Sequence, residues 1–586
     1  MKTIDRVTKR PRQVSPHAGQ TFWVANLLIL SGSGILVALA ASLAIACLML
    51  HLGMPVSLAA LWVGCSSAIA FLAWSCAVLS EGYRQKRLFF AALAMGVLIG
   101  FCGLGVAAQF LDLSGDGNWY HQEAVHQLAA GWNPYSQPPI VRPQGDGGLA
   151  VECFSKGIWI NETLLYLLAG DIEAAKGIHI ILALAAQALV WGLAVRLGIR
   201  AWLGGLIALV AVWNAVVIVQ MCSYYLDGDV SSSLVAFLAA AVLCLVVDGL
   251  AMPVVAASAL MLLASAKLTG IFYGGFFLAG LAGMGLFFRP WKAIARKAAI
   301  VSIGLIAGIT LEATPWQNWV KFQHPFYPLM GPNAKFEQMT LAAPRNLRDR
   351  NRFVQLGYSI VGQPELSFQQ DGEVQIKPWF QVSEKTLQAF RHWPDPNIAG
   401  YGIFMPETLL FTLLTVLLIV PKRTRAFGLL MLSCLLILLS VLLKPRVWYA
   451  RYNPQLTLLP VIPVLFVFVM ELRRPFGRLS REMASMTLLL LLLNSAIIAH
   501  DYLKGQRDLT VGAKEAIANL ENAAKWNDVT VNFFRLRAHR FLLERDHVRY
   551  QEIPDVTKLP CETPILIPSM HLRYCVSPKT GDAAHR

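Results

Sequence analysis

The chain has 586 residues, of which 56% are hydrophobic and only 15% are charged, and its mean hydropathy is +0.52. These values exclude a soluble globular protein. The formal net charge of +15 would suit nucleic acid, but most basic residues lie in short loops between apolar runs, where membrane orientation and anionic headgroups explain them. We therefore expect a polytopic membrane protein that contacts the lipid bilayer and no nucleic acid.

Apolar runs long enough to cross a membrane recur along most of the chain. Runs of roughly 17 to 25 residues cross about 30 Å of hydrocarbon as helices, whereas a membrane β-barrel shows shorter, alternating segments. The pattern predicts an all-α bundle of about 13 transmembrane helices. The expected spans are residues 26–52, 56–79, 88–110, 178–195, 203–221, 230–247, 252–266, 269–288, 298–313, 403–420, 426–443, 455–470 and 484–500.

The basic residues place two large loops and the end of the chain outside. With the basic N-terminus inside, the positive-inside rule puts residues 111–176 and 315–400 outside. Residues 1–500 form the transmembrane region, and residues 501–586 form a small outside subdomain of helix and short strands. The basic loop KPRVWYARYN, residues 444–453, breaks the rule because the count places it outside. Basic residues that oppose the topology indicate a ligand.

The first outside loop gathers carboxylates, histidines and aromatic residues in a short stretch. A turn, SGDGN at residues 114–118, precedes WYHQEAVHQLAAGW, whose apolar residues recur at helical spacing. We expect an amphipathic helix on the membrane surface, with its apolar face in the headgroups and Asp116, Tyr120 and Glu123 facing water. Asp116 has an alternative interpretation as the helix N-cap, a role that Asn118 also suits.

The positions of the cysteines allow one disulfide, in the outside tail. Six cysteines lie in the expected spans, where a buried thiol behaves as a small hydrophobic side chain. Cys561 and Cys575 lie in the outside tail, where oxidising conditions allow a disulfide between them. The chain contains no CxxC spacing typical of a metal site.

The first outside loop and four later motifs occur in a characteristic order. The loop holds an Asp shortly before a Tyr-His pair, an amphipathic helix and then GWNPY. The later motifs are SYYLDGDVSS at Ser223, ASAKLTG at Ala264, NWVKFQHPFYPLMGP at Asn318 and WYARYNPQLTLLPVIP at Trp448. Together they resemble the GT-C superfamily of integral-membrane glycosyltransferases, which includes the protein O-mannosyltransferases and the lipid A aminoarabinose transferase and in which this loop carries an active-site acidic residue. The chain departs from many members in having two spans, not one, ahead of the span that precedes the loop.

The resemblance implies a GT-C-like enzyme of the bacterial cytoplasmic membrane whose active site faces the periplasm. It implies inverting transfer of a sugar from a polyprenyl-phosphate-linked donor to a hydroxyl of a lipid-linked glycan or a protein. Such a reaction needs a base for the acceptor and cations for the departing phosphate. Asp116 is the candidate base and Glu123 a second catalytic carboxylate, with Glu152 and Glu162 in reserve. Nothing in the spacing requires a metal, but a divalent cation would take Asp116 as a ligand.

Cationic and aromatic residues outside the spans are the candidates for binding the sugar phosphate. Lys267, in ASAKLTG, is expected at the outer end of a span, where it contacts phosphate or snorkels to the interface. Arg446 and Arg451, in the exceptional basic loop, suit bidentate binding of phosphate oxygens. Asp227 and Asp229, on a short outside loop, either bind sugar hydroxyls or form a solvated turn. The expected substrate-binding set also includes Tyr120, His121 and Tyr452, the last of which alternatively belongs to an interfacial aromatic belt.

Two other function classes fit the same outline. A transporter or lipid flippase is also polytopic, but its charged residues lie near the midplane, often on broken helices, whereas those of this chain cluster in outside loops. An O-antigen ligase or polymerase has a similar outline and uses a lipid-diphosphate donor. We therefore expect a glycosyltransferase and keep these two classes as alternatives.

Overall fold

The computed structural model describes residues 16–79, 83–287, 289–335, 343–364, 372–391, 394–395, 398–419, 425–470 and 476–578. Over these residues the chain is mostly helical, and eight helices are long and apolar enough to cross a membrane. Six further apolar helices have 10–17 residues. Four of these six coincide with expected spans and a fifth, Ala201–Val212, covers the first part of another, so the structure supports a membrane bundle while the count of about 13 spans stays a prediction.

The first half of the bundle packs its helices closely through glycine. Its helices are α2 (Pro16–His51), α3 (Leu58–Leu79), α4 (Tyr83–Ala107), α9 (Gly177–Arg196), α12 (Asp227–Val246), α13 (Ala251–Ala266), α14 (Leu268–Gly285) and α15 (Trp291–Thr310). A Cβ added at Gly103 of α4 would lie 2.9 Å from the carbonyl oxygen of Gly177, and one at Gly304 of α15 only 2.0 Å from that of Ala257 in α13. Such backbone proximity is a main source of attraction between helices in lipid.

The second half of the bundle contains a broken helix. Its helices are α10 (Ala201–Val212), α11 (Ala215–Gln220), α20 (Met405–Ile419), α21 (Arg425–Leu442), α22 (Leu458–Val469) and α23 (Phe476–Trp526). Residues 203–221, expected as one span, therefore form two helices. Asn214 causes the break, because its side-chain oxygen caps α11 by accepting hydrogen bonds from the backbone N–H groups of Val216 and Val217 at 3.1 and 3.3 Å.

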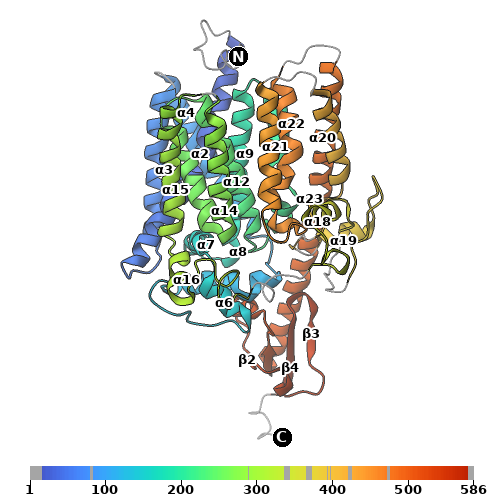
Figure 1. Ribbon diagram of the computed structural model, residues 1–586. Helices are drawn as coiled ribbons and strands as arrows, with labels where there is room; N and C mark the ends of the chain where they lie inside the picture. Colours follow the sequence, from blue (N-terminus) through green and yellow to red (C-terminus); the bar gives the residue numbers. More distant parts are fainter. Residues whose placement is uncertain are drawn as a thin grey trace.

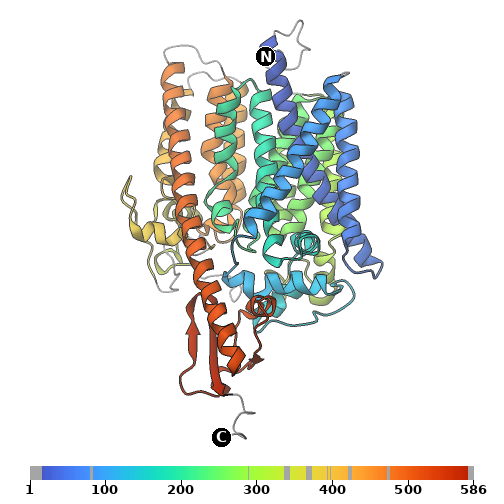
Figure 2. The ribbon, with the colours of Figure 1, turned by 180° about the vertical axis from the view of Figure 1, so that it is seen from behind.

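The shorter helices gather at the end of the bundle opposite the start of α2 (Figures 1 and 2). We call this end the loop end. The two expected outside loops therefore share one end, together with the C-terminal region. The shorter helices are η1 (Gly117–His121), α5 (Gln122–Ala129), α6 (Asp146–Cys153), α7 (Gly157–Ala169), α8 (Ile172–Ala175), α16 (Thr314–Phe322), α18 (Arg352–Val361), α19 (Glu384–Arg391), η4 (Ala450–Tyr452) and η5 (Pro454–Thr457), with η2 (Arg345–Leu347).

The helix of the first loop does not lie in the headgroups as expected. Val125 and Leu128, on its apolar face, are fully buried inside the protein, and Tyr120 and Glu123, expected to face water, are buried as well. The reason is that α7 covers one side of α5, and the C-terminal region covers another. Amphipathic spacing identifies the apolar face of a helix but does not say whether lipid or protein covers it.

The C-terminal region adds a small sheet, so the fold is not entirely helical. Helix α23 continues without a break through Asp501, the expected boundary, and carries the sheet beyond the bundle (Figure 2). The strand order is β2-β1-β4-β3, with β1 parallel to β2 and the other pairs antiparallel. The elements are β1 (Asn527–Asn532), η6 (Arg537–His539), α24 (Arg540–Arg545), β2 (Gln551–Glu552), η7 (Val556–Lys558), β3 (Ile565–Ile567), η8 (Pro568–Met570) and β4 (Leu572–Pro578).

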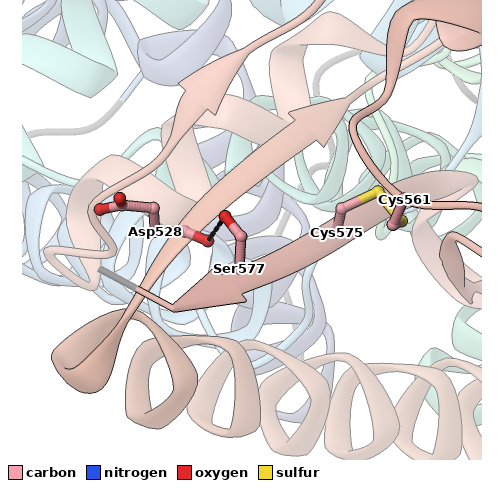
Figure 3. Close-up of a disulfide and its surroundings, with 4 residues drawn as sticks. All are labelled: Asp528, Cys561, Cys575 and Ser577. Atoms are coloured by element: carbon pink, nitrogen blue, oxygen red, sulfur yellow. Dashed lines mark hydrogen bonds between the residues drawn. A yellow bond between two sulfur atoms is a disulfide. The ribbon is translucent and has the colours of Figure 1, made fainter. Parts of the chain in front are cut away.

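The expected disulfide between Cys561 and Cys575 is confirmed (Figure 3). It ties the chain before β3 to the middle of β4. Farther along β4, the Ser577 hydroxyl donates to the carbonyl oxygen of Asp528 in β1 at 3.5 Å (Figure 3). The sheet is small, and its hydrophobic core is completed by Ile517 and Leu520 of α23. A covalent crosslink is therefore an important restraint on this subdomain.

Replacing both Cys561 and Cys575 by serine should destabilise the sheet and leave the bundle intact. The two residues are 14 positions apart, and a closed loop of about 15 residues contributes roughly 3 kcal/mol in the chain-entropy model. Hydrogen exchange of β3 and β4 in the purified protein measures the effect. Replacing the exposed free thiol of Cys102 by serine is the control. Equal protection of β4 in both variants would contradict the prediction.

Candidate functional site

A buried arginine at the loop end contacts three carboxylates that come from distant parts of the chain. Arg451 lies in η4, between α21 and α22. Its Nη2 lies 2.9 Å from Oδ2 of Asp116, its Nη1 lies 3.2 Å from Oδ1 of Asp395, and its Nε donates to Asp227. Each nitrogen of the guanidinium thus faces a different carboxylate. This is the planar fork geometry that arginine provides and lysine does not.

Lys267 extends this group of charges. Its Nζ lies 2.5 Å from Oδ1 of Asp227, whose other oxygen accepts from Arg451, so Asp227 bridges the two cations. Lys267 separates α13 from α14, and its extended backbone breaks what would otherwise be one helix. The Lys267 and Asp116 side chains are 24% and 25% exposed, whereas those of Arg451 and Asp227 are 7% and 5% exposed. Two members of the cluster are therefore accessible to a ligand.

The turn before η1 directs Asp116 toward Arg451. The Asn118 side chain donates to the carbonyl oxygens of Asp112 and Ser114 at 2.7 and 3.0 Å, which closes the turn. Gly117 is required there, because an added Cβ would lie 2.0 Å from Oδ2 of Asp112. Asp116 precedes η1, but its side chain makes no capping hydrogen bond. The N-cap interpretation of Asp116 is therefore wrong.

The structure also corrects the environment of Asp227 and Asp229. Both were expected on an outside loop, but they occupy the first turn of α12 and are buried. The solvated-turn alternative is therefore wrong. Asp229 contacts Nδ1 of His179 at 2.7 Å, and Nε2 of the same ring lies 3.5 Å from Oε1 of Glu162. Glu162 belongs to this separate acid–histidine group, which adjoins the cluster through α12.

The other two sequence-predicted carboxylates lie in ion pairs away from Arg451. Glu123 accepts from Nη1 and Nη2 of Arg540, in α24, at 2.6 and 3.1 Å, so both carboxylate oxygens are engaged. Glu152 pairs with Arg142 at 3.4 Å and with Lys321 at 3.1 Å. Glu123 and Glu152 therefore lie outside the Arg451 cluster, and Glu123 has a structural role.

Aromatic residues surround Arg451. The guanidinium carbon lies 4.4 Å from the ring centre of Tyr225 and 5.6 Å from that of Tyr452. Nζ of Lys267 lies 5.0 Å from the same Tyr452 ring. Cations in these positions are attracted to the ring faces. Tyr452 therefore belongs to the cluster and not to an interfacial belt.

The remaining predicted residues flank the cluster. Tyr120 and His121, in η1, have ring centres 4.2 Å apart, and the His121 ring centre lies 6.4 Å from that of Tyr225. Burial, followed by the neighbouring Asp116, raises the pKa of Tyr120 well above its usual value, so its phenol stays protonated. Arg446 has a positive φ of 61°, and its carbonyl oxygen accepts from the Asn453 side chain at 3.2 Å. Arg446 thus shapes the loop that carries Arg451.

Two members of the site were not found from the sequence. Asp395 accepts from the Tyr449 hydroxyl at 2.6 Å, and burial raises its pKa, with Arg451 opposing that effect. Lys444 donates to the Tyr273 hydroxyl at 2.6 Å and to the carbonyl oxygen of Tyr452. Lys444 was part of the exceptional basic loop, and that signal could have identified it. Asp395 lies in a proline-rich loop with no pattern that distinguishes it from its neighbours.

The cluster does not resemble a metal centre. Among the residues that the structure describes, no group of three or more His, Cys, Asp or Glu side chains is placed to hold a metal ion. The guanidinium of Arg451 occupies the position between Asp116, Asp227 and Asp395 where a divalent cation would bind. We therefore derive no chemical step through a metal.

Comparison of the chain with protein-family models, with curated proteins and with solved structures finds no match.

The Glu123–Arg540 pair should couple the first loop to the C-terminal subdomain. Replacing either residue by alanine leaves a buried charge without its partner, which should cost about 3 kcal/mol. The double variant should lose less than the sum of the two single losses, by about 2 kcal/mol. Hydrogen exchange in α5 and α24 measures these free energies. Arg545→Ala, at an exposed pair with Asp546, is the control and should cost less than about 1 kcal/mol. Additive losses would contradict the coupling.

Proposed function

We propose that the protein is a glycosyltransferase that moves a sugar from a polyprenyl-phosphate-linked donor to an acceptor hydroxyl, with inversion. The observation that carries the proposal is the direct contact between Asp116, the candidate base, and Arg451, the candidate phosphate ligand. A buried ion cluster is weak support for stability, since desolvation offsets its attraction. Strongly interacting charges that a ligand can reach are typical of functional sites.

Asp116 is proposed as the general base. Its carboxylate takes the proton of the acceptor hydroxyl while the acceptor oxygen attacks the anomeric carbon from the face opposite the phosphate. The bond between the anomeric carbon and the phosphate oxygen breaks, and its electron pair leaves with polyprenyl phosphate. The proton passes from Asp116 to solvent or to the released phosphate. The site is then ready for another donor.

Lys267 and Arg451 are proposed to stabilise the negative charge that develops on the leaving phosphate. In the free protein both cations are paired with carboxylates. A phosphate therefore has to displace a carboxylate before it can bind either cation. When phosphate oxygens accept the hydrogen bond of Nη2 of Arg451, the Oδ2 atom of Asp116 loses that hydrogen bond. Donor binding thereby frees the base for the acceptor hydroxyl. The rings of Tyr225 and Tyr452 lie against the guanidinium of Arg451 and help to hold it in place for the phosphate.

The position of the cluster favours this proposal over a transporter. The charges lie at the loop end, on η4, on the turn before η1 and at the first turn of α12. A transport pathway places its charged residues near the middle of the membrane, where the two halves of the protein meet. A ligase or polymerase that uses a lipid diphosphate remains an outcome that donor specificity tests.

Asp116→Asn should lower sugar transfer by about 100-fold or more, because the amide cannot accept the proton. Polyprenyl monophosphate donors with radioactive sugars, offered to membrane lipid and protein acceptors, measure transfer in proteoliposomes. Asp248→Asn is the matched control, since Asp248 is 82% exposed and lies beyond the other end of α12. Full activity of the Asp116→Asn variant, or lipid movement without bond formation, would refute the proposal. Transfer only from a diphosphate donor would favour the ligase class.

Lys267→Met should raise the KM for the donor about tenfold, because it removes a charged hydrogen bond to the phosphate. Asp227 keeps its contact with Arg451 in this variant, so the fold should be retained. Steady-state kinetics with increasing donor concentration measure the change. Lys297→Met, at the opposite end of the bundle, is the lysine control. An unchanged KM with Lys267→Met would remove Lys267 from the phosphate site.

A further inference from the structure

A tryptophan fixes the ring of His121 from one side. The Nε1–H group of Trp159, in α7, donates to Nδ1 of His121 at 2.7 Å. Both residues are buried: the exposed fraction is 3% for His121 and 0% for Trp159. The two residues are 38 positions apart in the chain. The contact therefore depends on the packing of α7 against the first loop, and the ring has little freedom to turn.

This contact defines the protonation state of His121. Indole nitrogen only donates hydrogen bonds, so Nδ1 of His121 has to be the acceptor and carries no proton. Burial, followed by the positive charges of Lys267 and Arg451, lowers the pKa of His121 well below its usual value. The ring is therefore neutral across the physiological pH range. Its one proton is on Nε2, which makes Nε2 a hydrogen-bond donor.

The ring of His121 adjoins the charge cluster. It lies between Tyr120, with ring centres 4.2 Å apart, and Tyr225, whose ring also faces the guanidinium of Arg451. The ionisable groups that act on His121 are Lys267, Arg451, Asp227 and His179. Within the described part of the chain, no residue accepts a hydrogen bond from its Nε2. Nε2 is not among the fully enclosed side-chain atoms that lack a partner, so a ligand can reach this donor and supply its acceptor.

We propose that Trp159 holds His121 as the neutral Nε2–H tautomer, and that this N–H donates a hydrogen bond to an oxygen of the bound sugar phosphate. This inference rests on the function proposed above and defines the role of His121 within it. His121 then acts neither as a base nor as a cation for phosphate. Trp159 is a positioning residue, because it touches the imidazole and not the substrate.

The tautomer is tested without any substrate. In protein labelled with 15N-histidine, the resonances lost in His121→Gln belong to His121. Their shifts should show an unprotonated Nδ1 and a protonated Nε2 from pH 5 to pH 8. In Trp159→Phe the Nδ1 constraint is removed, and the mixture of tautomers should change. A protonated Nδ1 in the wild-type protein would overturn the inference, whatever the protein's activity.

The hydrogen bond is tested with polyprenyl monophosphate, with and without an attached sugar, as binding probes for the full-length protein in detergent. His121→Leu should weaken binding about tenfold, and His121→Gln, whose amide nitrogen reaches a similar place, should recover most of that loss. His126→Gln is the matched control, since His126 stacks on Phe541 in the C-terminal region. A loss with both probes assigns the acceptor to phosphate, and a loss only with the sugar probe assigns it to the sugar.

The outcomes separate this inference from the proposed function. Equal binding by the His121→Leu, His121→Gln and wild-type proteins would overturn the donor role of His121. Wild-type binding that depends on a group titrating between pH 5 and pH 8, and loses this dependence in His121→Gln, would also overturn it. If neither probe binds the wild-type protein while the tautomer is as inferred, the proposed donor class fails and the arrangement of Trp159 and His121 stands. If His121→Leu lowers thermal stability, its weaker binding has a structural cause, and the His121→Gln and Trp159→Phe results then decide whether His121 is a donor.

Discussion

The loop end of this protein is organised by the need to neutralise one buried arginine. A guanidinium cannot give up its proton, so burial of Arg451 requires carboxylates within contact distance. The chain supplies them from three places: the turn before η1, the first turn of α12 and the second outer loop. The three segments are far apart in sequence, and each has to be folded before Arg451 is fully paired. Packing of the whole loop end is thus linked to the geometry of one side chain.

The C-terminal region takes part in this arrangement. Helix α23 leaves the bundle next to the first loop, where the Thr510 hydroxyl oxygen accepts from the backbone N–H of Leu111 at 3.1 Å. Farther on, Arg540 holds Glu123 with two hydrogen bonds. The segment that contains Asp116 therefore has contacts with the C-terminal region on both sides. Helices α23 and α24 of the C-terminal region therefore hold the loop from which Asp116 reaches Arg451.

The sequence identified the parts of the site better than their surroundings. Asp116 and Arg451 were singled out because a polar loop and a misplaced basic loop interrupt apolar runs, a signal that survives without any tertiary information. Their contact could not be predicted, since 335 positions separate them. Asp227 was misplaced because the expected span began at residue 230, after the polar residues, whereas in the fold α12 begins at Asp227. The position of Asp395 and the burial of α5 depend on packing between distant segments, and no local sequence pattern indicates such packing.

The balance of charge in the cluster explains how such a site can be selective. Three carboxylates face two cations, so an arbitrary anion gains little by entering, because it meets Asp116, Asp227 and Asp395 as well as Lys267 and Arg451. Burial raises the pKa of Asp395, and the neighbouring Arg451 opposes that effect, so this carboxyl is the one at which the excess of negative charge is most strongly felt. An anion that enters has to take the place of a carboxylate at Arg451 or Lys267, because both cations are already paired. The pairing of Arg451 with Asp116 therefore acts against anions that cannot displace a carboxylate.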